Sequence, residues 1–321
     1  MKTPDYWLSD SLISKVLAPI SFIYGFLTQL RLKLHESPKA EVPVICIGNI
    51  TAGGTGKTPV SLAIARMLIN DIYHPFFVTR GYGGKVKNVI VNNKKHTAQE
   101  VGDEPLLLSE KAPTVVNPNR YEGAKLAVKE GADLIIMDDG FQNPSLKKDL
   151  SFLVFDGNYG IGNGKIIPSG PLRETFENGI KRADALIILG KDKHHLAKRT
   201  KLPTFYAQLE TTQTATAKNK VIAFAGIGHP QKFYNTLKEH GFNILKTFDF
   251  PDHHFYNKKE LEDILAQAQT LNAEVYTTSK DFVKIPHSLK NDIKVLEVAV
   301  VWEKPETLLK FIKDKISKKS A

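Results

Sequence analysis

The 321-residue chain contains one cysteine, Cys46, and no apolar stretch long enough to cross a lipid bilayer. A single cysteine excludes an internal disulfide framework and fits a reducing compartment. The most apolar window, Val16–Leu30, would be about 22 Å long as a helix, which is shorter than the roughly 30 Å hydrocarbon core of a bilayer. No A-x-A-like cleavage site follows this window, so we expect neither a membrane span nor a secretory signal peptide.

Acidic residues are scarce relative to basic ones, and the formal net charge is +10. Such a surface attracts anions, which include phosphates, nucleic acids and acidic membranes, and charge alone does not choose among them. The lysines are dispersed, and no face interleaves them with aromatic side chains. We therefore expect no nucleic-acid partner.

The apolar window Val16–Leu30 has two interpretations. Lys15 precedes it, and Arg31 and Lys33 follow it. The helix could pack on the protein's own core, or it could lie in a membrane interface with its flanking cations on lipid phosphates. The positive balance of the chain favours the interfacial helix.

The most informative segment runs from Thr51 to Thr58, TAGGTGKT, between an apolar run and a helix-like stretch. In such a loop, glycines turn backbone N–H groups towards a polyphosphate, a lysine reaches the outer phosphates, and the final hydroxyl ligates Mg²⁺. The sequence therefore predicts a nucleotide site. Its expected residues are Gly53, Gly54, Thr55, Gly56, Lys57 and Thr58.

One position of this loop departs from the usual pattern, because Thr51 stands where the first glycine is expected. The alternative interpretation is a glycine-rich turn that happens to precede Lys-Thr. For the base, the D-x-x-G switch is absent, and Gly190–Lys193 reads GKDK where a guanine site would read N-K-x-D. We therefore expect adenine.

Beyond the loop, apolar runs alternate with amphipathic stretches. Near-continuous apolar strands separated by helices indicate an α/β fold with a parallel sheet covered on both faces, and ligands lie at the carboxyl ends of such strands. The segment Lys85–Thr97 breaks this pattern, and we interpret it as a β-hairpin. The runs that carry the pattern are Phe76–Arg80, Thr114–Asn117, Leu134–Asp139, Phe152–Asp156 and Leu186–Gly190.

The run Leu134–Gly140, LIIMDDG, ends in two carboxylates. A strand in this position commonly provides carboxylates that hold Mg²⁺ directly or through water, although Asp-Asp-Gly is also an ordinary turn. The phosphate-binding loop upstream favours the metal. Asp138 and Asp139 therefore join Thr58 as candidate Mg²⁺ ligands.

A polar stretch, Thr211–Lys220, separates this pattern from a second alternation of strands and helices. We expect an N-terminal helix over 1–37, a nucleotide-binding domain over 38–210 and a smaller α/β domain over 211–321. The elements predicted for the smaller domain are Val221–Ala225, Pro230–His240, Phe242–Phe248, Lys258–Thr270, Glu274–Thr278, Lys294–Val300 and Pro305–Ser317.

Four polar loops carry candidate chemistry. Gly102–Pro105, GDEP, places two carboxylates at a helix start, where the alternative is simple N-terminal capping. Pro251–His254, PDHH, follows a strand, and its spacing does not form a zinc site. Arg80–Gly84 and Ser169–Glu174 carry arginines that suit phosphate or sugar recognition.

Together these motifs closely resemble the tetraacyldisaccharide 4′-kinase family, the lipid A disaccharide kinases of Gram-negative bacteria. The resemblance covers nearly the whole chain, in the order GGTGKTP, RGYGG, GDEP, NPNRY, DDGFQ, GPLRE and FPDHH. It implies two P-loop-like, Rossmann-like α/β/α domains joined by a hinge, a cleft between them and a membrane-docked N-terminal helix. One departure is Ser279, where the family's T-E-K-D-A-V-K stretch has glutamate.

The resemblance also implies a reaction, in which the γ-phosphoryl group of ATP passes to the 4′-hydroxyl of a tetraacylated glucosamine disaccharide 1-phosphate. Asp103 would accept the proton of that hydroxyl, His253 from the other domain would orient Asp103, and Lys57 would act on the phosphates. Arg120 and Arg173 are then the candidates for phosphate contact. Substrate contacts in the cleft are expected from Arg80, Tyr82, Gln142 and Glu174.

We expect ATP and Mg²⁺ as cofactors, the acylated disaccharide 1-phosphate and an anionic membrane surface as partners, and a monomer at the cytoplasmic face of the bacterial inner membrane. The rival from another class is a P-loop ATPase switch that modifies no small molecule. Such switches typically carry a second lysine where this chain has Ala52. A soluble metabolic kinase is a third possibility, which the N-terminal helix disfavours.

Overall fold

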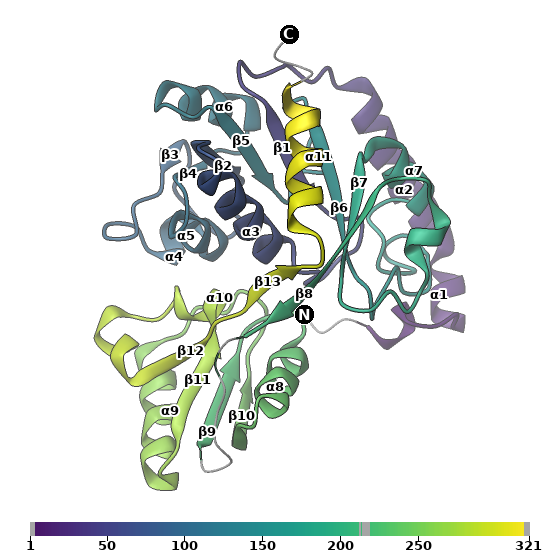
Figure 1. Cartoon of the computed structure of the whole chain (residues 1–321). Coiled ribbons are helices and arrows are strands. Elements are labelled where there is room, and N and C mark those ends of the chain that lie inside the picture. The colour runs from purple at the N-terminus through teal and green to yellow at the C-terminus, as the bar shows by residue number, and fades with distance from the viewer. Residues whose placement is uncertain (1–3, 212, 214–218, 318–321) are drawn as a thin grey trace.

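The computed structural model describes residues 4–211, 213 and 219–317, which form two sheets with helices packed around them (Figure 1). Of the polar stretch predicted over Thr211–Lys220, residues 212 and 214–218 lie outside the described residues. The fold is mixed α/β, as the sequence predicts.

The larger sheet has nine strands in the order β13-β8-β7-β6-β1-β5-β2-β4-β3. The strands from β8 to β4 are parallel, and the edge strands β13 and β3 run antiparallel to their neighbours. Their bounds are β1 Val44–Gly48, β2 Pro75–Thr79, β3 Val89–Ile90, β4 Thr114–Val116, β5 Leu134–Asp138, β6 Leu150–Asp156, β7 Ala185–Leu189, β8 Thr204–Glu210 and β13 Ala299–Trp302.

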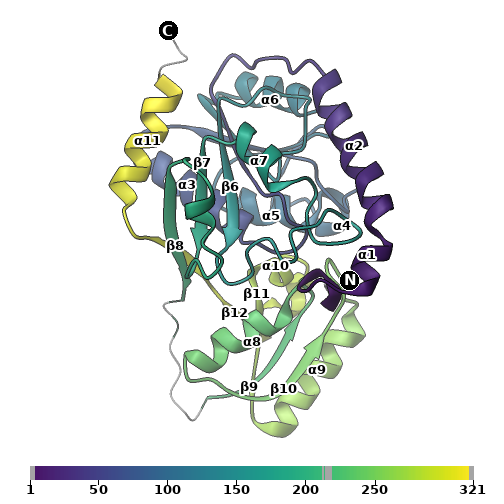
Figure 2. The ribbon, with the colours of Figure 1, turned by 90° about the vertical axis from the view of Figure 1, so that its right-hand side faces the viewer.

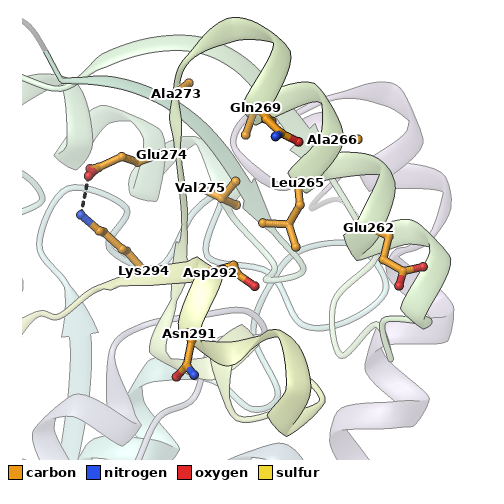
Figure 3. A pocket seen from close by; sticks show the side chains of 11 residues that line it. Glu262, Leu265, Ala266, Gln269, Ala273, Glu274, Val275, Asn291, Asp292 and Lys294 are labelled. Carbon is orange, nitrogen blue, oxygen red and sulfur yellow. Dashed lines mark hydrogen bonds and ion pairs between the residues drawn. The ribbon is translucent and has the colours of Figure 1, made fainter.

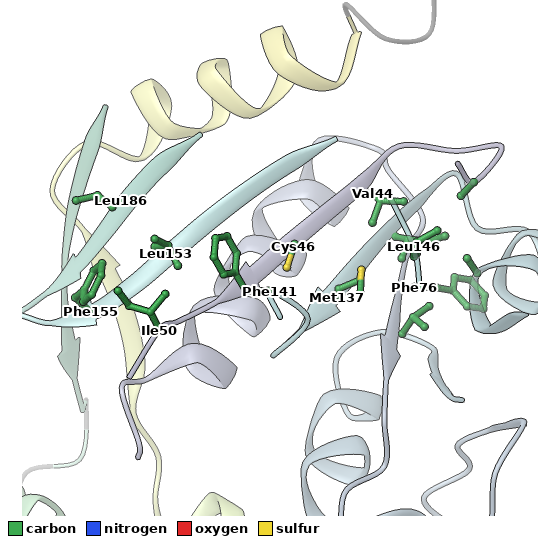
Figure 4. Close-up of a cluster of buried hydrophobic side chains, with 14 of the residues drawn as sticks. Val44, Cys46, Ile50, Phe76, Met137, Phe141, Leu146, Leu153, Phe155 and Leu186 are labelled. Atoms are coloured by element: carbon green, nitrogen blue, oxygen red, sulfur yellow. The ribbon is translucent and has the colours of Figure 1, made fainter. Parts of the chain in front are cut away.

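The central strands are buried on both faces, which explains why they read as near-continuous apolar runs. In β1, Val44 and Cys46 pack with Phe141 on one face (Figure 4). Ile45 and Ile47 alternate with them and belong to the core on the other face. Helices α6 and α7 cover the first face, and α3, α5 and α11 cover the second. These helices are α3 Lys57–Asn70, α5 Asp103–Ser109, α6 Arg120–Lys129, α7 Phe176–Arg182 and α11 Pro305–Ser317.

The smaller sheet has four parallel strands in the order β10-β9-β11-β12. Helix α8 packs on one face and α9 on the other, so this sheet also lies between two helical layers. The bounds are β9 Lys220–Ala225, α8 Pro230–Glu239, β10 Asn243–Asp249, α9 Lys258–Leu271, β11 Glu274–Thr278, α10 Ser279–Phe282, η3 His287–Asp292 and β12 Ile293–Leu296.

The end of the described chain returns to the larger sheet, contrary to the expectation that 211–321 forms one unit. The strand predicted over Lys294–Val300 is two strands, and the second, β13, pairs antiparallel with β8. Helix α11 then buries Leu308 and Ile312 against the larger sheet. Pairing β13 with β8 covers a sheet edge that would otherwise expose unpaired backbone groups.

The β-hairpin predicted over Lys85–Thr97 is wrong. Only β3 forms there, and it pairs with β4 instead of with a second strand of the same segment. The chain turns at Asn92, whose backbone N–H donates to Nδ1 of His96. Thr97 then caps α4 (Ala98–Val101) in a reciprocal arrangement with Glu100, so the polar residues serve a turn and a helix start.

The N-terminal segment forms η1 (Asp5–Trp7), α1 (Leu12–Val16) and α2 (Ala18–Leu34), which run along one side of the molecule (Figure 2). Small and polar residues of these helices dock on the loop before α7: the Ser14 hydroxyl donates to the Ser169 carbonyl at 2.8 Å, and the Ser21 and Ser169 hydroxyls lie 2.7 Å apart. Across residues 4–211, 213 and 219–317, no helix combines the length and apolar character that a membrane span requires.

Most apolar side chains of α1 and α2 stay exposed, which reverses the arrangement of an ordinary surface helix. Phe22 is 76% exposed and Phe26 is 59% exposed, whereas Ser21 and Gly25 are buried. Packing on the protein and lying in a membrane interface are therefore compatible for this segment. One face of the helices packs on the protein, and the other face is apolar and exposed.

Candidate functional site

The predicted phosphate loop connects β1 to α3, at the carboxyl edge of the larger sheet. Gly53 and Gly56 have positive φ angles of 107° and 84°, a backbone conformation that glycine adopts without strain. Helix α3 begins at Lys57, so its unpaired N–H groups and the positive end of its dipole face the loop. The loop thus has the local geometry of an anion cradle.

The departure at Thr51 has a structural role. Thr51 is fully buried and forms a β-bridge with Leu172, and the N–H of Ala52 donates to the Pro171 carbonyl at 2.7 Å. The first position of the loop is therefore held by the segment that carries Arg173. A side chain that fills this space suits the position better than glycine would.

Asn49, which was not predicted from the sequence, contacts the phosphate loop through its side chain. Its buried side-chain amide donates to the Thr55 hydroxyl at 2.8 Å and lies 3.4 Å from the Thr51 hydroxyl, while its backbone carbonyl accepts from the Gln142 side chain. The signal was present as a polar residue near the end of an apolar strand, a position where ligand-site residues collect in parallel sheets.

Asp138 lies at the end of β5 with both carboxylate oxygens occupied by hydroxyl donors. Thr58 donates to one oxygen at 2.9 Å, and Ser61, which the sequence analysis did not identify, donates to the other at 2.8 Å. Burial and the nearby charge of Glu104 raise the pKa of Asp138 to about 7. A cation at this position would favour the ionised form.

Asp139 adopts a positive φ of 51° and turns its carboxylate towards two cations. Arg173 donates to it at 3.0 Å, and Nζ of Lys57 lies 3.7 Å away. Burial raises the pKa of Asp139, but the Lys57 and Arg173 charges outweigh that effect and hold it at about 2. The two adjacent carboxylates thus have opposite electrostatic environments.

The residues around Thr58 fit a magnesium ion. Mg²⁺ prefers oxygen ligands and is usually held by one or two carboxylates with several waters and substrate phosphates, so a closed protein cage is not required. The hydroxyl of Thr58 and the carboxylate of Asp138 supply such oxygens side by side. Consistent with this open arrangement, the described part of the chain contains no group of three or more His, Cys, Asp and Glu side chains in metal-binding positions.

Asp103 and His253 come together from opposite sheets. Asp103 opens α5 beside the larger sheet, and His253 lies in the loop after β10 of the smaller sheet with a φ of 60°. Nδ1 of His253 lies 2.9 Å and 3.1 Å from the two oxygens of Asp103. The pair predicted from the family resemblance is therefore formed, while His254 contacts Glu260 instead.

The carboxylate of Asp103 is only 4% exposed. Burial raises its pKa, but the hydrogen bond from His253 and the charge of Lys280 outweigh burial and hold the pKa of Asp103 below its usual range. For His253, the hydrogen bond to Asp103 raises the pKa more than burial lowers it. The arrangement therefore keeps Asp103 ionised.

The predicted cleft residues Tyr82, Gln142 and Glu174 differ in their exposure and in their partners. Tyr82 is mostly exposed and places its ring 5.2 Å from the His253 ring, and Gln142 donates to Glu174 at 2.9 Å while accepting from Arg173 at 3.2 Å. Glu174 is only 1% exposed and also pairs with Arg182. Its burial behind Gln142 does not fit the predicted direct contact with substrate.

Arg120 is 3% exposed, and its guanidinium donates to the backbone carbonyls of Asn117 and Pro118. Burial and the neighbouring charge of Arg80 lower the pKa of Arg120 to about 10. Among the described residues, Nε of Arg120 has no hydrogen-bond partner and no carboxylate forms an ion pair with it. A buried cation without a carboxylate partner suits contact with an anionic ligand.

The smaller sheet also reaches the phosphate loop. A Cβ built on Gly53 would lie 3.5 Å from Nε2 of His229, at the start of α8. Lys232 on α8 forms an ion pair with Asp156 at the end of β6. The sequence analysis missed both residues, because nothing local distinguishes them from other surface side chains.

A surface pocket of about 580 Å³ lies apart from these residues, between α9, β11 and the segment before β12 (Figure 3). Glu274 and Lys294 form an ion pair on its wall. None of the site residues predicted from the sequence lines this pocket. They gather instead where the two sheets meet, and we take that junction as the candidate site.

Comparison with known proteins gives one consistent family. The family model described as LpxK, tetraacyldisaccharide-1-P 4'-kinase, matches residues 13–317. The tetraacyldisaccharide 4'-kinase of Paramagnetospirillum magneticum is 45% identical over 96% of this chain and 97% of its own length. The corresponding protein of Gluconobacter oxydans is 41% identical over 95% of both chains.

The same relationship is visible in three dimensions. The crystal structure of LpxK from Aquifex aeolicus in complex with ATP superposes on this chain with a TM-score of 0.77. The two sequences are 28% identical, and the match covers 95% of this chain and all of the other.

Proposed function

This chain belongs to the tetraacyldisaccharide-1-P 4'-kinase family, and we propose that it transfers the γ-phosphoryl group of ATP to the 4′-hydroxyl of a tetraacyldisaccharide 1-phosphate in lipid A biosynthesis. The bond between the γ-phosphorus and the β–γ bridging oxygen breaks, a bond from the 4′-oxygen to phosphorus forms, and the hydroxyl proton leaves to a base. The observation that carries this assignment is the meeting of Asp103 and His253 at the edge of the sheet that bears the phosphate loop.

The phosphate loop holds the nucleotide in this proposal. The backbone from Gly53 to Gly56 surrounds the phosphates, and Lys57 moves from Asp139 to the outer phosphate oxygens. Neutralising those oxygens favours transfer, because catalysis of phosphoryl transfer is mainly positioning and electrostatic stabilisation.

Thr58 and Asp138 would hold Mg²⁺, with Asp139 beside them. A bound Mg²⁺ would supply positive charge that offsets the negative charge of the phosphates. Ser61 keeps the Asp138 carboxylate in position through its hydrogen bond.

Asp103 is the base that accepts the hydroxyl proton. Its low pKa keeps it ionised, and the short contact to His253 fixes its orientation. A base of this kind typically contributes a rate factor of about 10²–10⁴. Because His253 comes from the smaller sheet, the active arrangement depends on how the two sheets are placed.

The remaining cations and polar groups receive the acceptor and the phosphates. Arg173 lies beside Asp139, and Arg120 presents a buried charge without a carboxylate partner. Arg80, Tyr82 and Gln142 lie in loops around the same junction and are proposed to contact the sugar.

Helices α1 and α2 would bring the enzyme to its lipid substrate at the cytoplasmic face of the membrane. Most of their apolar side chains are exposed, and Lys15, Arg31 and Lys33 lie near the two ends of the segment. An apolar helix face bordered by cations is typical of interfacial binding to anionic lipids. The proposal does not require the helix to span.

A transfer assay tests the assignment directly. Purified protein is incubated with γ-³²P-ATP, Mg²⁺ and a detergent-dispersed tetraacyldisaccharide 1-phosphate, and the organic-soluble product is counted. We expect label in the lipid. Label found only in inorganic phosphate would refute the kinase assignment and favour an ATPase.

A further inference from the structure

Lys280 lies where no role has been assigned, in the short helix α10 that follows β11. Its Nζ is 3.4 Å from Nε2 of His253, 3.3 Å from an oxygen of Glu104 and 3.6 Å from an oxygen of Asp252. Its side chain is only 23% exposed. Lys280 therefore contacts Nε2 of the imidazole, and Asp103 contacts Nδ1 on the other side of the ring.

The two sides of the His253 ring have different chemical requirements. Nδ1 faces the ionised carboxylate of Asp103 and must carry a proton to donate to it. Nε2 lies 3.4 Å from the Lys280 ammonium group, which has donors but no acceptor, and 3.9 Å from an oxygen of Asp252, which is beyond hydrogen-bond distance; Nε2 must therefore be unprotonated to accept from Lys280. Only the neutral ring with hydrogen on Nδ1 satisfies both contacts.

The helix that carries Lys280 is held by a buried network. Asp281 has no exposed surface, and its oxygens accept from the Tyr256 hydroxyl at 2.9 Å, the Thr278 hydroxyl at 2.7 Å and the Gly226 N–H at 3.1 Å. Nζ of Lys284 lies 2.7 Å from the same carboxylate. Such a network fixes α10 and limits how far Lys280 can move.

We propose that Lys280 is a positioning residue that holds His253 as the neutral Nδ1–H tautomer, so that Asp103 enters the reaction as a carboxylate bonded to a neutral ring and is a stronger base than it would be beside an imidazolium. This inference rests on the proposed function of Asp103 as the base. The lysine does not touch the reacting atoms in this account. It acts through the charge and tautomer of the histidine.

The charges around the His253 ring determine whether loss of Lys280 favours or disfavours its protonation. Protonating Nε2 would place a second positive charge against Lys280, so the lysine disfavours the imidazolium. Asp103 and Asp252 favour the imidazolium, and removing Lys280 leaves only the burial of the ring to oppose them. The groups that face His253 or its carboxylate partner are Asp103 and Glu104 of α5, Tyr82, Asp252, Lys280 of α10 and Lys284.

The test uses pH profiles of kcat/KM for the lipid in the full chain, with Lys280→Met and Lys280→Arg. Lys280→Met should move the acidic limb upward by about one pH unit, a typical size for the loss of one neighbouring charge. Lys280→Arg, which keeps the charge, should restore the limb. A limb that does not move in Lys280→Met overturns the proposal.

A matched control separates this effect from simple bridging between the sheets. Lys232→Met removes the ion pair with Asp156, which also joins the two sheets but does not contact His253. We expect no displacement of the limb in this variant. An equal displacement in Lys232→Met and Lys280→Met would mean that bridging alone is responsible and would overturn the proposal.

A second readout does not depend on activity. In ¹⁵N-histidine-labelled protein, the His253 signals are assigned by comparison with His253→Gln. We expect the Nδ1–H tautomer in the wild type at pH values above the raised pKa of the ring, and a larger imidazolium fraction at the same pH in Lys280→Met. Unchanged signals would overturn the proposal, whereas the expected signals together with full turnover of Asp103→Asn would refute the base and leave the tautomer control standing.

Discussion

At the scale of single residues, the site is built from carboxylates whose surroundings set their charge. Asp138 is buried with hydroxyl donors, Asp139 is 33% exposed and lies beside cations, and Asp103 is buried against an imidazole. Loss of hydration raises the pKa of all three, so the partners decide the outcome. Asp139 and Asp103 stay ionised, while the pKa of Asp138 rises to about 7.

The pKa shifts of Asp103 and His253 predict how kcat/KM depends on pH. The pKa of His253 is raised above 6.5, and the neutral ring is the active form in this account, so kcat/KM should fall as the pH drops through that raised value. In His253→Gln this fall should be absent, and any remaining acidic limb should reflect Asp103, whose pKa rises when the hydrogen bond from His253 is lost. Rate profiles between pH 5 and 9 check this, and an unchanged limb in His253→Gln would contradict it.

The same shift has the opposite sign for stability. A group whose pKa is raised by folding stabilises the folded state when it is protonated. The His253–Asp103 contribution to the free energy of unfolding should therefore be complete below pH 6.5 and be lost as the pH rises through the raised pKa. Activity and the strength of this contact thus change in opposite directions with pH.

At the scale of elements, α2 docks by its small side chains and exposes its large apolar ones. Replacing Phe22 and Phe26 together by serine should raise the KM for the lipid at least about tenfold, because each ring contributes about 1.5–3 kcal/mol when buried in an apolar phase. The KM for ATP and the melting temperature should change little, since both rings are exposed on the protein.

Ile72 provides the control for α2. It is 87% exposed at the end of α3, so Ile72→Ser removes a comparable exposed apolar group away from the helix. Steady-state kinetics on mixed micelles should show normal lipid KM in this variant. A normal lipid KM in the double phenylalanine variant would show that α2 does not dock on the lipid phase.

Helix α11 is the second element with a specific consequence. Ile312 is fully buried in the core of the larger sheet, although it lies far along the chain from the other residues of that core. Ile312→Ala should lower the free energy of unfolding by about 2–5 kcal/mol, as is usual for a cavity of this size. Denaturant unfolding measures the change, and a loss below about 1 kcal/mol would mean that α11 is not integral to this core.

At the scale of the whole molecule, two sheets meet at one functional junction. Contacts that join them near the site include Asp103 with His253, Glu104 with Lys280, and the Tyr82 ring with the His253 ring. An arrangement that completes the site only when both sheets are in place would limit access of water to the phosphates. Such exclusion suppresses hydrolysis of ATP in kinases.

Part of this arrangement could be predicted from the sequence. The phosphate loop, the two aspartates after β5 and the start of α5 at Asp103 follow from local patterns, and the structure places each of them at the sheet edge. The partnership of Asp103 with His253 came only from the family resemblance. No periodicity connects residues so distant in the chain.

The features that the sequence analysis missed share a physical cause. Asn49 and Ser61 act through hydrogen bonds to other segments, and the roles of His229 and Lys280 depend on packing of the smaller sheet. The return of β13 to the larger sheet is likewise a long-range contact. Local patterns report periodicity and capping, and they carry little information about such contacts.

Asp103, oriented by its hydrogen bond with His253, is the base that accepts the proton of the lipid hydroxyl during phosphoryl transfer; this is the central claim. The most direct test is the single-turnover rate of phosphoryl transfer in Asp103→Asn at saturating ATP and lipid, with the dissociation constant for ATP measured on the same sample. We predict a rate lower by about 10²–10⁴ and an unchanged affinity for ATP. A transfer rate equal to that of the wild type would contradict the account.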